Sequence, residues 1–254
     1  MKTPELSLKD KVALVTGATG GIGGAIAEAF GLAGARVFLH GRNPVKLAAL
    51  TQEFNEKGIE TRHAALDISA AGNAQTLVDA VLRELGTIDI LVNSAGINRP
   101  EPAETVSEKN WDDVMDINLK ALFFVTQAAG KVMIKKGGGK IVHISSQAGL
   151  VALPLRAAYC SSKGGLNQLT RTLAMEWAPH RINVNAVAPT FVETPFTKEM
   201  FMDENFKRYV LDSIPLGRMA TPEEVAYATL FLASNLADMI TGHVLTVDGG
   251  WTIK

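Results

Sequence analysis

The segment that most constrains the fold is a short apolar run that leads directly into a cluster of glycines. Residues 11–16 (KVALVT) are mostly apolar, residues 17–24 (GATGGIGG) follow at once, and an alanine-rich helical pattern continues to Ala33. This order predicts a buried strand, a tight turn and a helix, which together begin an α/β fold.

The spacing of the glycines in this turn suits a phosphate ligand. Glycine allows positive φ and a close approach of ligand to backbone, and the start of a helix presents free N–H groups. An ordinary connecting turn is the alternative. Because Gly17, Gly21 and Gly23 follow a predicted strand and open a predicted helix, we favour binding of a dinucleotide pyrophosphate.

The same alternation of strand and helix continues along the chain. Predicted strands span residues 36–40, 60–66, 88–92, 140–144, 182–188 and 243–247, and predicted helices span 44–57, 76–85, 111–129, 159–177 and a segment that a capping box opens at Thr221. This alternation predicts an α/β protein with a doubly wound parallel sheet flanked by helices. We expect one Rossmann domain over residues 1–254.

Residues 191–216 interrupt this regular pattern. Methionine and aromatic side chains stand among polar residues there. Such side chains adapt to an apolar ligand, so the segment predicts a substrate lid, with plain core packing as the alternative.

Composition indicates a globular protein with small-molecule ligands. The sequence is 47% hydrophobic, and its net charge of -1 gives no basic footprint for nucleic acid or an anionic membrane. We find no apolar leader pattern and no stretch of about 18 uncharged apolar residues. The single cysteine, Cys160, and five scattered histidines favour a reducing compartment and no metal site. We therefore expect a cytoplasmic protein.

The end of the second predicted strand bears on the choice of cofactor. Gly41-Arg42 stands about where a dinucleotide fold places the residue that contacts the adenosine ribose. A carboxylate there would favour NAD, whereas arginine can pair with a 2′-phosphate. Arg42 therefore favours NADP(H), with a solvated arginine and NAD(H) as the alternative. Asp67, at a later strand end, could cap a helix or accept a hydrogen bond from adenine.

Four polar residues are candidates for catalysis. Tyr159 and Lys163 stand four positions apart in a predicted helix and share a face. A cation beside a phenol lowers its pKa and suits it to acid–base chemistry, although both residues could simply decorate an amphipathic helix. Asn118 interrupts a helical pattern in which asparagine is unfavourable, and Ser146 follows a strand at the edge where α/β sheets bind ligands.

Together these motifs closely resemble the classical short-chain dehydrogenase/reductase family over essentially the whole chain. The resemblance rests on Thr16-Gly17-x-x-x-Gly21-x-Gly23, Asn93-x-Ala95-Gly96, Asn118, Ser146, Tyr159-x-x-x-Lys163 and Pro189. Tyr159 follows Ser146 by 13 residues, a spacing that is also similar to the family's and favours Ser146 over Ser145. The resemblance implies an NAD(P)-dependent oxidoreductase that interconverts a secondary alcohol and a ketone by hydride transfer.

The resemblance also implies a role for each site residue. Tyr159 would exchange a proton with the substrate oxygen and Ser146 would hydrogen-bond that oxygen. Lys163 would lower the pKa of Tyr159 and hold the nicotinamide ribose, and Asn118 would anchor a water in a proton relay. The implied cofactor contacts are Gly17, Thr19, Gly21, Ile22, Gly23, Arg42, Asp67, Ile68, Asn93, Ala95, Gly96, Tyr159, Lys163, Pro189, Val192 and Thr194. The substrate contacts would be Ser146, Leu153, Tyr159, Phe191 and Phe196.

Three residues depart from the family pattern. Ser94 replaces the usual second asparagine of the Asn-Asn-Ala-Gly motif, and Thr190 replaces the usual glycine after Pro189, which narrows the space beside the nicotinamide. Gly20 stands where many NADP-specific members carry a basic residue, which weakens the inference from Arg42.

The substrate is indicated by resemblance only. Residues 95–99 (AGINR) and 247–252 (VDGGWT) are similar to gluconate 5-dehydrogenase-like members, and the chain is less closely similar to 3-oxoacyl-carrier-protein reductases. We expect a sugar acid or a small keto compound. Arg99 and Arg156 could meet a carboxylate, but we favour solvated surface arginines. The apolar Leu153, Phe191 and Phe196 favour a less polar ketone.

The resemblance also implies the family's usual homotetramer. Three alternatives remain for the function. The chain could be a 3-oxoacyl-carrier-protein reductase, a broad ketone reductase, or a module that senses cofactor without turnover. An acyl-carrier partner would need a basic docking patch, for which the candidates are Lys120, Lys131, Lys135 and Lys136.

Overall fold

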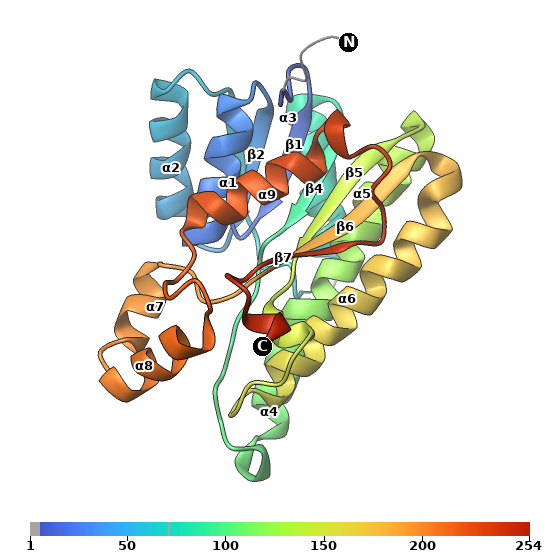
Figure 1. Ribbon diagram of the computed structural model, residues 1–254. Coiled ribbons are helices and arrows are strands. Elements are labelled where there is room, and N and C mark those ends of the chain that lie inside the picture. Colours follow the sequence, from blue (N-terminus) through green and yellow to red (C-terminus); the bar gives the residue numbers. More distant parts are fainter. Residues whose placement is uncertain (1–5, 71) are drawn as a thin grey trace.

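A single parallel sheet forms the centre of the protein in this computed structural model, which describes residues 6–70 and 72–254 and no side chains at positions 195, 196 and 199. Seven strands lie in the order β3-β2-β1-β4-β5-β6-β7 (Figure 1). They are β1 (Val12–Thr16), β2 (Arg36–Gly41), β3 (Thr61–Ala65), β4 (Ile90–Asn93), β5 (Gly139–Ile144), β6 (Ile182–Pro189) and β7 (Val244–Val247). The predicted doubly wound parallel sheet is confirmed.

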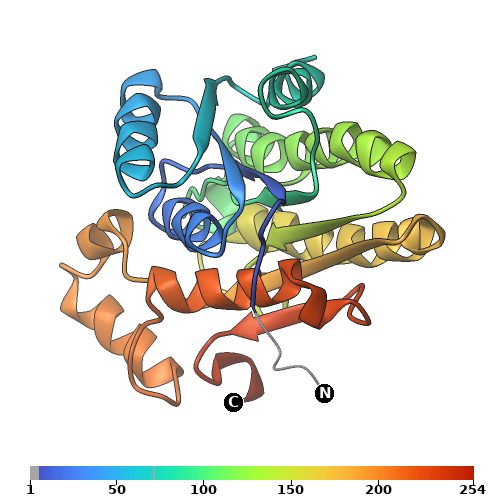
Figure 2. The same cartoon turned by 90° about the horizontal axis from the view of Figure 1, so that it is seen from above.

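Helices cover both faces of the sheet (Figure 2). One face carries α1 (Gly21–Leu32), α2 (Pro44–Glu56) and α9 (Pro222–Ala233), and the other carries α3 (Asn73–Leu85), α5 (Leu122–Lys136) and α6 (Ala157–Trp177). Short 3-10 turns are η1 (Ala103–Thr105), η3 (Gln147–Gly149), η4 (Ala178–His180), η5 (Asn235–Ala237) and η6 (Trp251–Ile253).

Alternate residues of each central strand pack into opposite cores. In β1, Ala13 and Val15 pack with α1 and α9, whereas Val12 and Leu14 pack with α3, α5 and α6. Successive side chains of a strand point to opposite faces, and a sheet covered on both sides needs apolar residues on both. This explains why the strands read as continuous apolar runs.

The strand order reverses between β1 and β4, and this reversal positions the ligand site. β1 pairs with β2 on one side and with β4 on the other. The connections from these strands leave in opposite directions and open a crevice at the carboxyl edge of the sheet. The glycine turn after β1 and the loop after β4 both lie at this crevice.

The predicted helix over residues 111–129 is longer and less regular than expected. It comprises α4 (Glu108–Met115), a π-helical turn η2 (Asp116–Ala121) and α5, in one continuous run. The run Glu108–Lys136 is long and apolar enough to cross a membrane by length and composition, but half of its apolar window is buried inside the protein. It packs as a core helix against the sheet.

Segment 191–216 forms two short helices beyond the carboxyl edge of the sheet (Figure 1). These are α7 (Pro195–Met200) and α8 (Glu204–Ser213). Phe191 packs on Phe206 of α8 with ring centroids 5.7 Å apart, and on Trp251 at the same separation. The aromatic residues of this segment therefore pack together and also contact the C-terminal turn η6.

Candidate active site

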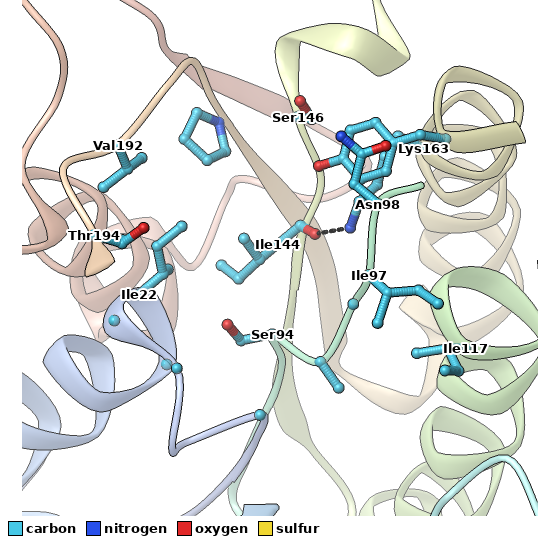
Figure 3. Close-up of a pocket in the computed structure, with 18 of the residues that line it drawn as sticks. Ile22, Ser94, Ile97, Asn98, Ile117, Ile144, Ser146, Lys163, Val192 and Thr194 are labelled. Carbon is cyan, nitrogen blue, oxygen red and sulfur yellow. Dashed lines mark hydrogen bonds between the residues drawn. The ribbon is translucent and has the colours of Figure 1, made fainter. Parts of the chain in front are cut away.

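A cavity of about 630 Å³ lies at the carboxyl edge of the sheet. Figure 3 shows Ile22 and Thr194 on one side of it and Lys163 and Ser146 on the other. The first group belongs to the glycine turn and the segment after β6, and the second to α6 and the end of β5. Residues far apart in the sequence thus meet around one space.

The glycine turn packs against the loop that follows β4. Gly17 has a φ of 69°, and a Cβ added there would lie 2.8 Å from the Cα of Ala95. A Cβ at Gly23 would lie 2.3 Å from the carbonyl oxygen of Gly17. Both positions therefore require glycine, because a side chain would collide with backbone.

The start of α1 fits a pyrophosphate. The helix begins at Gly21 with no side-chain cap and no acidic residue in its first turn. Its first N–H groups and the positive end of its dipole therefore face the cavity without competition from a carboxylate. Gly21 lies directly beneath Thr194, because a Cβ there would sit 2.7 Å from the Thr194 Cγ2 atom.

The adenosine end of the cavity carries Arg42 and Asp67. Arg42 is exposed just beyond β2, and a Cβ at Gly41 would lie 3.1 Å from the Oγ1 of Thr19. Hydrogen bonds from Ser69 and the nearby charge of Arg42 hold the pKa of Asp67 below its ordinary value. An exposed guanidinium therefore stands where a cofactor phosphate could reach it.

Lys163 is buried behind the cavity wall and tied to β5. Its Nζ donates a hydrogen bond of 2.8 Å to the carbonyl oxygen of Ile144, the dashed line in Figure 3. Burial lowers the pKa of Lys163 to about 8. An ammonium with three donors retains two N–H groups for a ligand on the cavity side.

Tyr159 differs from the sequence-based expectation in its acidity. Its ring centroid lies 5.7 Å from the Nζ of Lys163. Burial raises the pKa of Tyr159, and the nearby hydroxyl of Ser146 and the charge of Arg156 only partly oppose this effect. The expected lowering of this pKa by Lys163 is not seen, because the loss of water on burial has the largest effect on the phenol. At neutral pH the phenol therefore keeps its proton.

The two serines after β5 have different partners. Ser146 Oγ donates to Gln147 Oε1 at 2.8 Å and accepts from the Ala148 N–H at 3.1 Å. Ser145 Oγ donates to Asn167 Oδ1 at 2.6 Å. Both serines line the cavity, and the nearby hydroxyl of Ser146 acts on the pKa of Tyr159.

Asn118 sits in the π-helical turn η2 and holds the loop after β4. Its Oδ1 accepts from the Ile97 N–H at 2.8 Å, and its Nδ2 donates to the Ile97 carbonyl oxygen at 2.8 Å and to Ser162 Oγ at 3.1 Å. A π-helical turn often marks a functional position in a helix. The polar residue that disturbed the helical pattern is therefore neither solvent-facing nor free.

Most of the residues expected at the site line this one cavity. They are Gly17, Thr19, Gly21, Ile22, Gly23, Arg42, Asp67, Ile68, Ala95, Gly96, Ser146, Leu153, Tyr159, Lys163, Pro189, Phe191, Val192 and Thr194. Asn93 and Asn118 instead lie fully buried behind its wall, where Asn93 Nδ2 donates to Thr126 Oγ1 at 2.7 Å. The Phe196 side chain falls outside the described part of the structure.

The cavity also contains residues that sequence reasoning missed. Asn98, Ile117 and Gln147 line it, and the Ile144 carbonyl oxygen accepts from Lys163. Ile117 and the Ile144 carbonyl carry no chemical signal in the sequence. Asn98 and Gln147 follow strand ends that had already been singled out, so their position was the available signal.

The two candidate arginines have different environments. Arg99 also lines the cavity but is half-exposed, and its Nη2 lies 3.0 Å from Asp113 Oδ2. Arg156 is only 7% exposed and lines the cavity. The expectation of a solvated surface arginine is therefore wrong for Arg156, because α8 and Phe191 cover it.

Two lysines of the candidate docking patch already have acidic partners. Lys120 Nζ lies 3.1 Å from Asp116 Oδ1, and Lys136 forms a salt bridge with Asp89. Paired lysines offer less positive charge to an acidic carrier protein.

Comparison with known proteins gives matches along nearly the whole chain. The family model described as Enoyl-(Acyl carrier protein) reductase matches residues 17–252. The chain is 44% identical to D-threitol dehydrogenase of Mycolicibacterium smegmatis, over 98% of this chain and 96% of that protein. It is 43% identical to NAD-dependent glycerol dehydrogenase of Listeria innocua, over 98% and 97% of the two chains.

A sugar-acid enzyme is similar in both sequence and structure. Gluconate 5-dehydrogenase of Gluconobacter oxydans is 39% identical over 100% of both chains. The crystal structure of a gluconate 5-dehydrogenase from Burkholderia cenocepacia in complex with NADP and tartrate matches with a TM-score of 0.95 and 34% identity, covering 98% of each chain.

Proposed function

Because the chain belongs to the short-chain dehydrogenase/reductase family and is an oxidoreductase acting on CH–OH groups, we propose that it is an NADP(H)-dependent dehydrogenase of a small sugar acid. In this proposal it interconverts a secondary alcohol and a ketone. The observation that carries it is the meeting of Tyr159, Ser146 and Lys163 in the same cavity as the glycine turn and Arg42.

The choice of NADP(H) rests on the adenosine end of the cavity. The carboxylate that would pair with an NAD ribose is replaced by Gly41, and Arg42 follows it with an exposed guanidinium. Arginine forms bidentate hydrogen bonds with phosphate. The similar structure that contains NADP supports this choice, while the NAD-dependent relative keeps NAD(H) as the alternative.

The choice of a hydroxylated substrate rests on two polar atoms in the cavity wall. Asn98 Oδ1 and Thr190 Oγ1 are buried and have no hydrogen-bond partner among the described residues, and both residues line the cavity. A buried polar atom without a partner is costly, so a substrate that supplies hydroxyl groups would satisfy both. Thr190 stands where the family usually has glycine, so this contact would be particular to this chain.

Each catalytic residue has a role that its contacts support. NADP(H), when bound, supplies or accepts the hydride. The raised pKa of Tyr159 keeps its proton available for the carbonyl oxygen of a ketone. Ser146 would hydrogen-bond the same oxygen and stabilise the charge that develops there. Lys163, fixed by Ile144, would bind the ribose with its remaining donors.

Replacement of Tyr159 tests this proposal. Purified wild type and Tyr159→Phe are assayed with NADPH and 5-keto-D-gluconate. We expect kcat to fall by a factor of roughly 10² to 10⁴, the usual contribution of a positioned acid, while NADPH binding, followed by fluorescence, persists. Tyr227→Phe is the matched control, because Tyr227 is 60% exposed on α9. Retention of full activity by Tyr159→Phe would exclude the assigned role and favour a module that senses cofactor.

A neutral polyol is the second candidate substrate, favoured by the similarity to the D-threitol and glycerol dehydrogenases reported above. Pairing of Lys120 and Lys136 with carboxylates argues against the acyl-carrier alternative. We further propose a cytoplasmic homotetramer, as the family resemblance implies. Exposed apolar side chains such as Trp111 and Phe124 support an assembly, which light scattering of the purified protein would measure.

A further inference from the structure

One wall of the cavity holds a buried cation whose charge the fold does not neutralise. Arg156 is 7% exposed and lines the cavity together with Tyr159 and Ser146. Charged residues are rarely buried unless they are paired. The partners of this guanidinium therefore decide whether it is structural or meets a ligand.

The described part of the chain gives Arg156 no acidic partner. It has no salt bridge there, and its Nη1 donates to the Pro154 carbonyl oxygen at 2.9 Å. Glu101, whose backbone pairs with that of Arg156, forms no salt bridge with it among the described residues: its Oε1 accepts from Asn110 Nδ2 at 2.5 Å, and its buried Oε2 has no hydrogen-bond partner there. A guanidinium carries five N–H donors, so most of them remain available.

The position of Arg156 on α6 also gives folding little benefit. It is the N-cap residue of that helix and its side chain makes no capping hydrogen bond. The N-terminus of a helix carries partial positive charge, so a cation there is placed against the helix dipole. Burial lowers the pKa of Arg156, which reflects the same lack of compensation. The arginine and the helix together make this end of the cavity electropositive.

Aromatic rings hold the guanidinium in one place. Its central carbon lies 6.0 Å from the ring centroid of Phe191 and 5.6 Å from that of Phe206. Cation–π contacts of this kind fix the group while its N–H edges stay free for planar partners. A carboxylate that accepts two parallel hydrogen bonds is such a partner.

The distance along α6 places this cation beside the catalytic tyrosine. Arg156 is the N-cap residue of α6 and precedes Tyr159 by three positions; both line the cavity, and the charge of Arg156 acts on Tyr159. Among the described lining residues, Asp67 is the one that bears a carboxylate, and Asp67 stands at the adenosine end, bonded to Ser69. No acidic side chain of that lining would repel an anion from Arg156.

We propose that Arg156 binds the carboxylate of the substrate and so selects hydroxy and keto acids over neutral polyols of similar length. This inference rests on the proposed function, because it names the substrate class of the same site. The substrate carboxylate bound by Arg156 would lie about one helical turn from Tyr159. The carbon that reacts beside Tyr159 would then be separated from that carboxylate by a few bonds. Arg156 is then a specificity-determining residue of the oxidoreductase.

Steady-state kinetics with an acid and a neutral ketose test the proposal. Wild type, Arg156→Gln and Arg156→Lys are assayed with NADPH and either 5-keto-D-gluconate or D-fructose. We expect Arg156→Gln to lower the ratio of kcat/KM for the acid over the ketose by about tenfold or more, mainly through KM, as loss of a charge-assisted bidentate pair implies. Arg156→Lys should restore part of the ratio, because it keeps the charge without the planar fork.

The control is Arg208→Gln, which removes an exposed arginine of α8 that does not line the cavity. We expect its ratio to stay within about twofold of wild type, the allowance for screened long-range charge. An unchanged ratio in Arg156→Gln, or an equal loss with both substrates in a variant that keeps its melting temperature, would overturn the proposal.

A binding measurement separates this inference from the proposed function. Calorimetric titration of tartrate into the NADPH-loaded protein needs no turnover. If neither substrate is turned over but tartrate binds wild type at least tenfold more tightly than Arg156→Gln, the proposed activity fails and the carboxylate site stands. If tartrate binds both proteins equally or neither, the carboxylate site is overturned. Arg156→Lys provides the comparison if Arg156→Gln does not fold.

Discussion

His143 is a buried imidazole that the chemistry at the sheet edge does not use. It is 0% exposed in β5, and its Nδ1 lies 3.1 Å from Asn93 Nδ2. Within the described residues its Nε2 has no partner. Burial, reinforced by the charge of Lys163, lowers the pKa of His143 to about 3. The ring is therefore neutral in the folded protein, in agreement with its assignment to the core.

This shift predicts how stability depends on pH. Between the ordinary pKa of 6.5 and about 3, the unfolded chain binds a proton at His143 that the folded chain does not. The free energy of unfolding should therefore fall as pH drops through this window, by up to about 1.4 kcal/mol per pH unit. In urea titrations from pH 7 to pH 4, His143→Asn should remove that part of the slope.

The comparison uses the slope against pH, so a lower absolute stability of the variant does not disturb it. His180→Asn is the control, because that ring is already exposed to water in the folded protein. A wild-type slope that persists unchanged in His143→Asn would contradict the assignment.

At the scale of elements, a capping box stabilises the start of α9. Thr221 Oγ1 accepts from the Glu224 N–H at 3.3 Å, and Glu224 Oε2 accepts from the Thr221 N–H at 2.9 Å. Pro222 occupies the first helical position, where its missing N–H has no cost. The sequence pattern predicted this start because every participant lies within four residues.

Removal of the cap should destabilise the protein without affecting the cavity. Thr221→Ala leaves the Glu224 N–H without its acceptor, and we expect a loss of about 1 kcal/mol in the free energy of unfolding. The same substitution at the exposed Thr172, within α6, is the control and should cost less, because alanine favours a helix interior. Denaturant unfolding measures both, and equal losses would argue against the capping role.

The π-helical turn η2 shows how one element is shaped by another. Residues 116–121 widen the helical run around Asn118, whose amide satisfies both backbone groups of Ile97. A regular helix would give this amide a different direction. Hydrogen bonds with the loop after β4 are therefore associated with the π-helical geometry of η2.

At the scale of the whole molecule, the cavity joins the two halves of the sheet. Its walls come from the turn after β1, the loop after β4, α6 and the segment after β6. A ligand that binds all of these in the folded state stabilises the whole domain, by about 2.7 kcal/mol at a concentration one hundred times Kd.

We therefore expect NADPH to raise the melting temperature more than NADH at equal concentration. Arg42→Ala should remove this difference by weakening NADPH binding, since a hydrogen bond to a charged group contributes about 1.5–3 kcal/mol, and should leave the NADH shift intact. Arg62→Ala is the control, because Arg62 lies in β3 away from the described cavity lining. A larger shift with NADH in wild type would reverse the cofactor assignment and leave the catalytic residues in place.

The sequence by itself determined the alternation of strands and helices, the glycine turn and the shared helix face of Tyr159 and Lys163. These features depend on residues within a few positions of one another, so propensity, periodicity and turn chemistry are sufficient. The parallel sheet followed from the regular order of the units. Each motif is local, and the family resemblance rests on the order of these motifs along the whole chain.

Only the tertiary structure decided the environment of each side chain. It buried Arg156 beneath two phenylalanines, aimed Lys163 at Ile144, and raised the pKa of Tyr159 where a lowering was expected. Desolvation and long-range contacts set these properties, and both depend on segments that are distant in the sequence. A substrate-binding arginine and a solvated one read alike in the sequence and differ only in what packs around them.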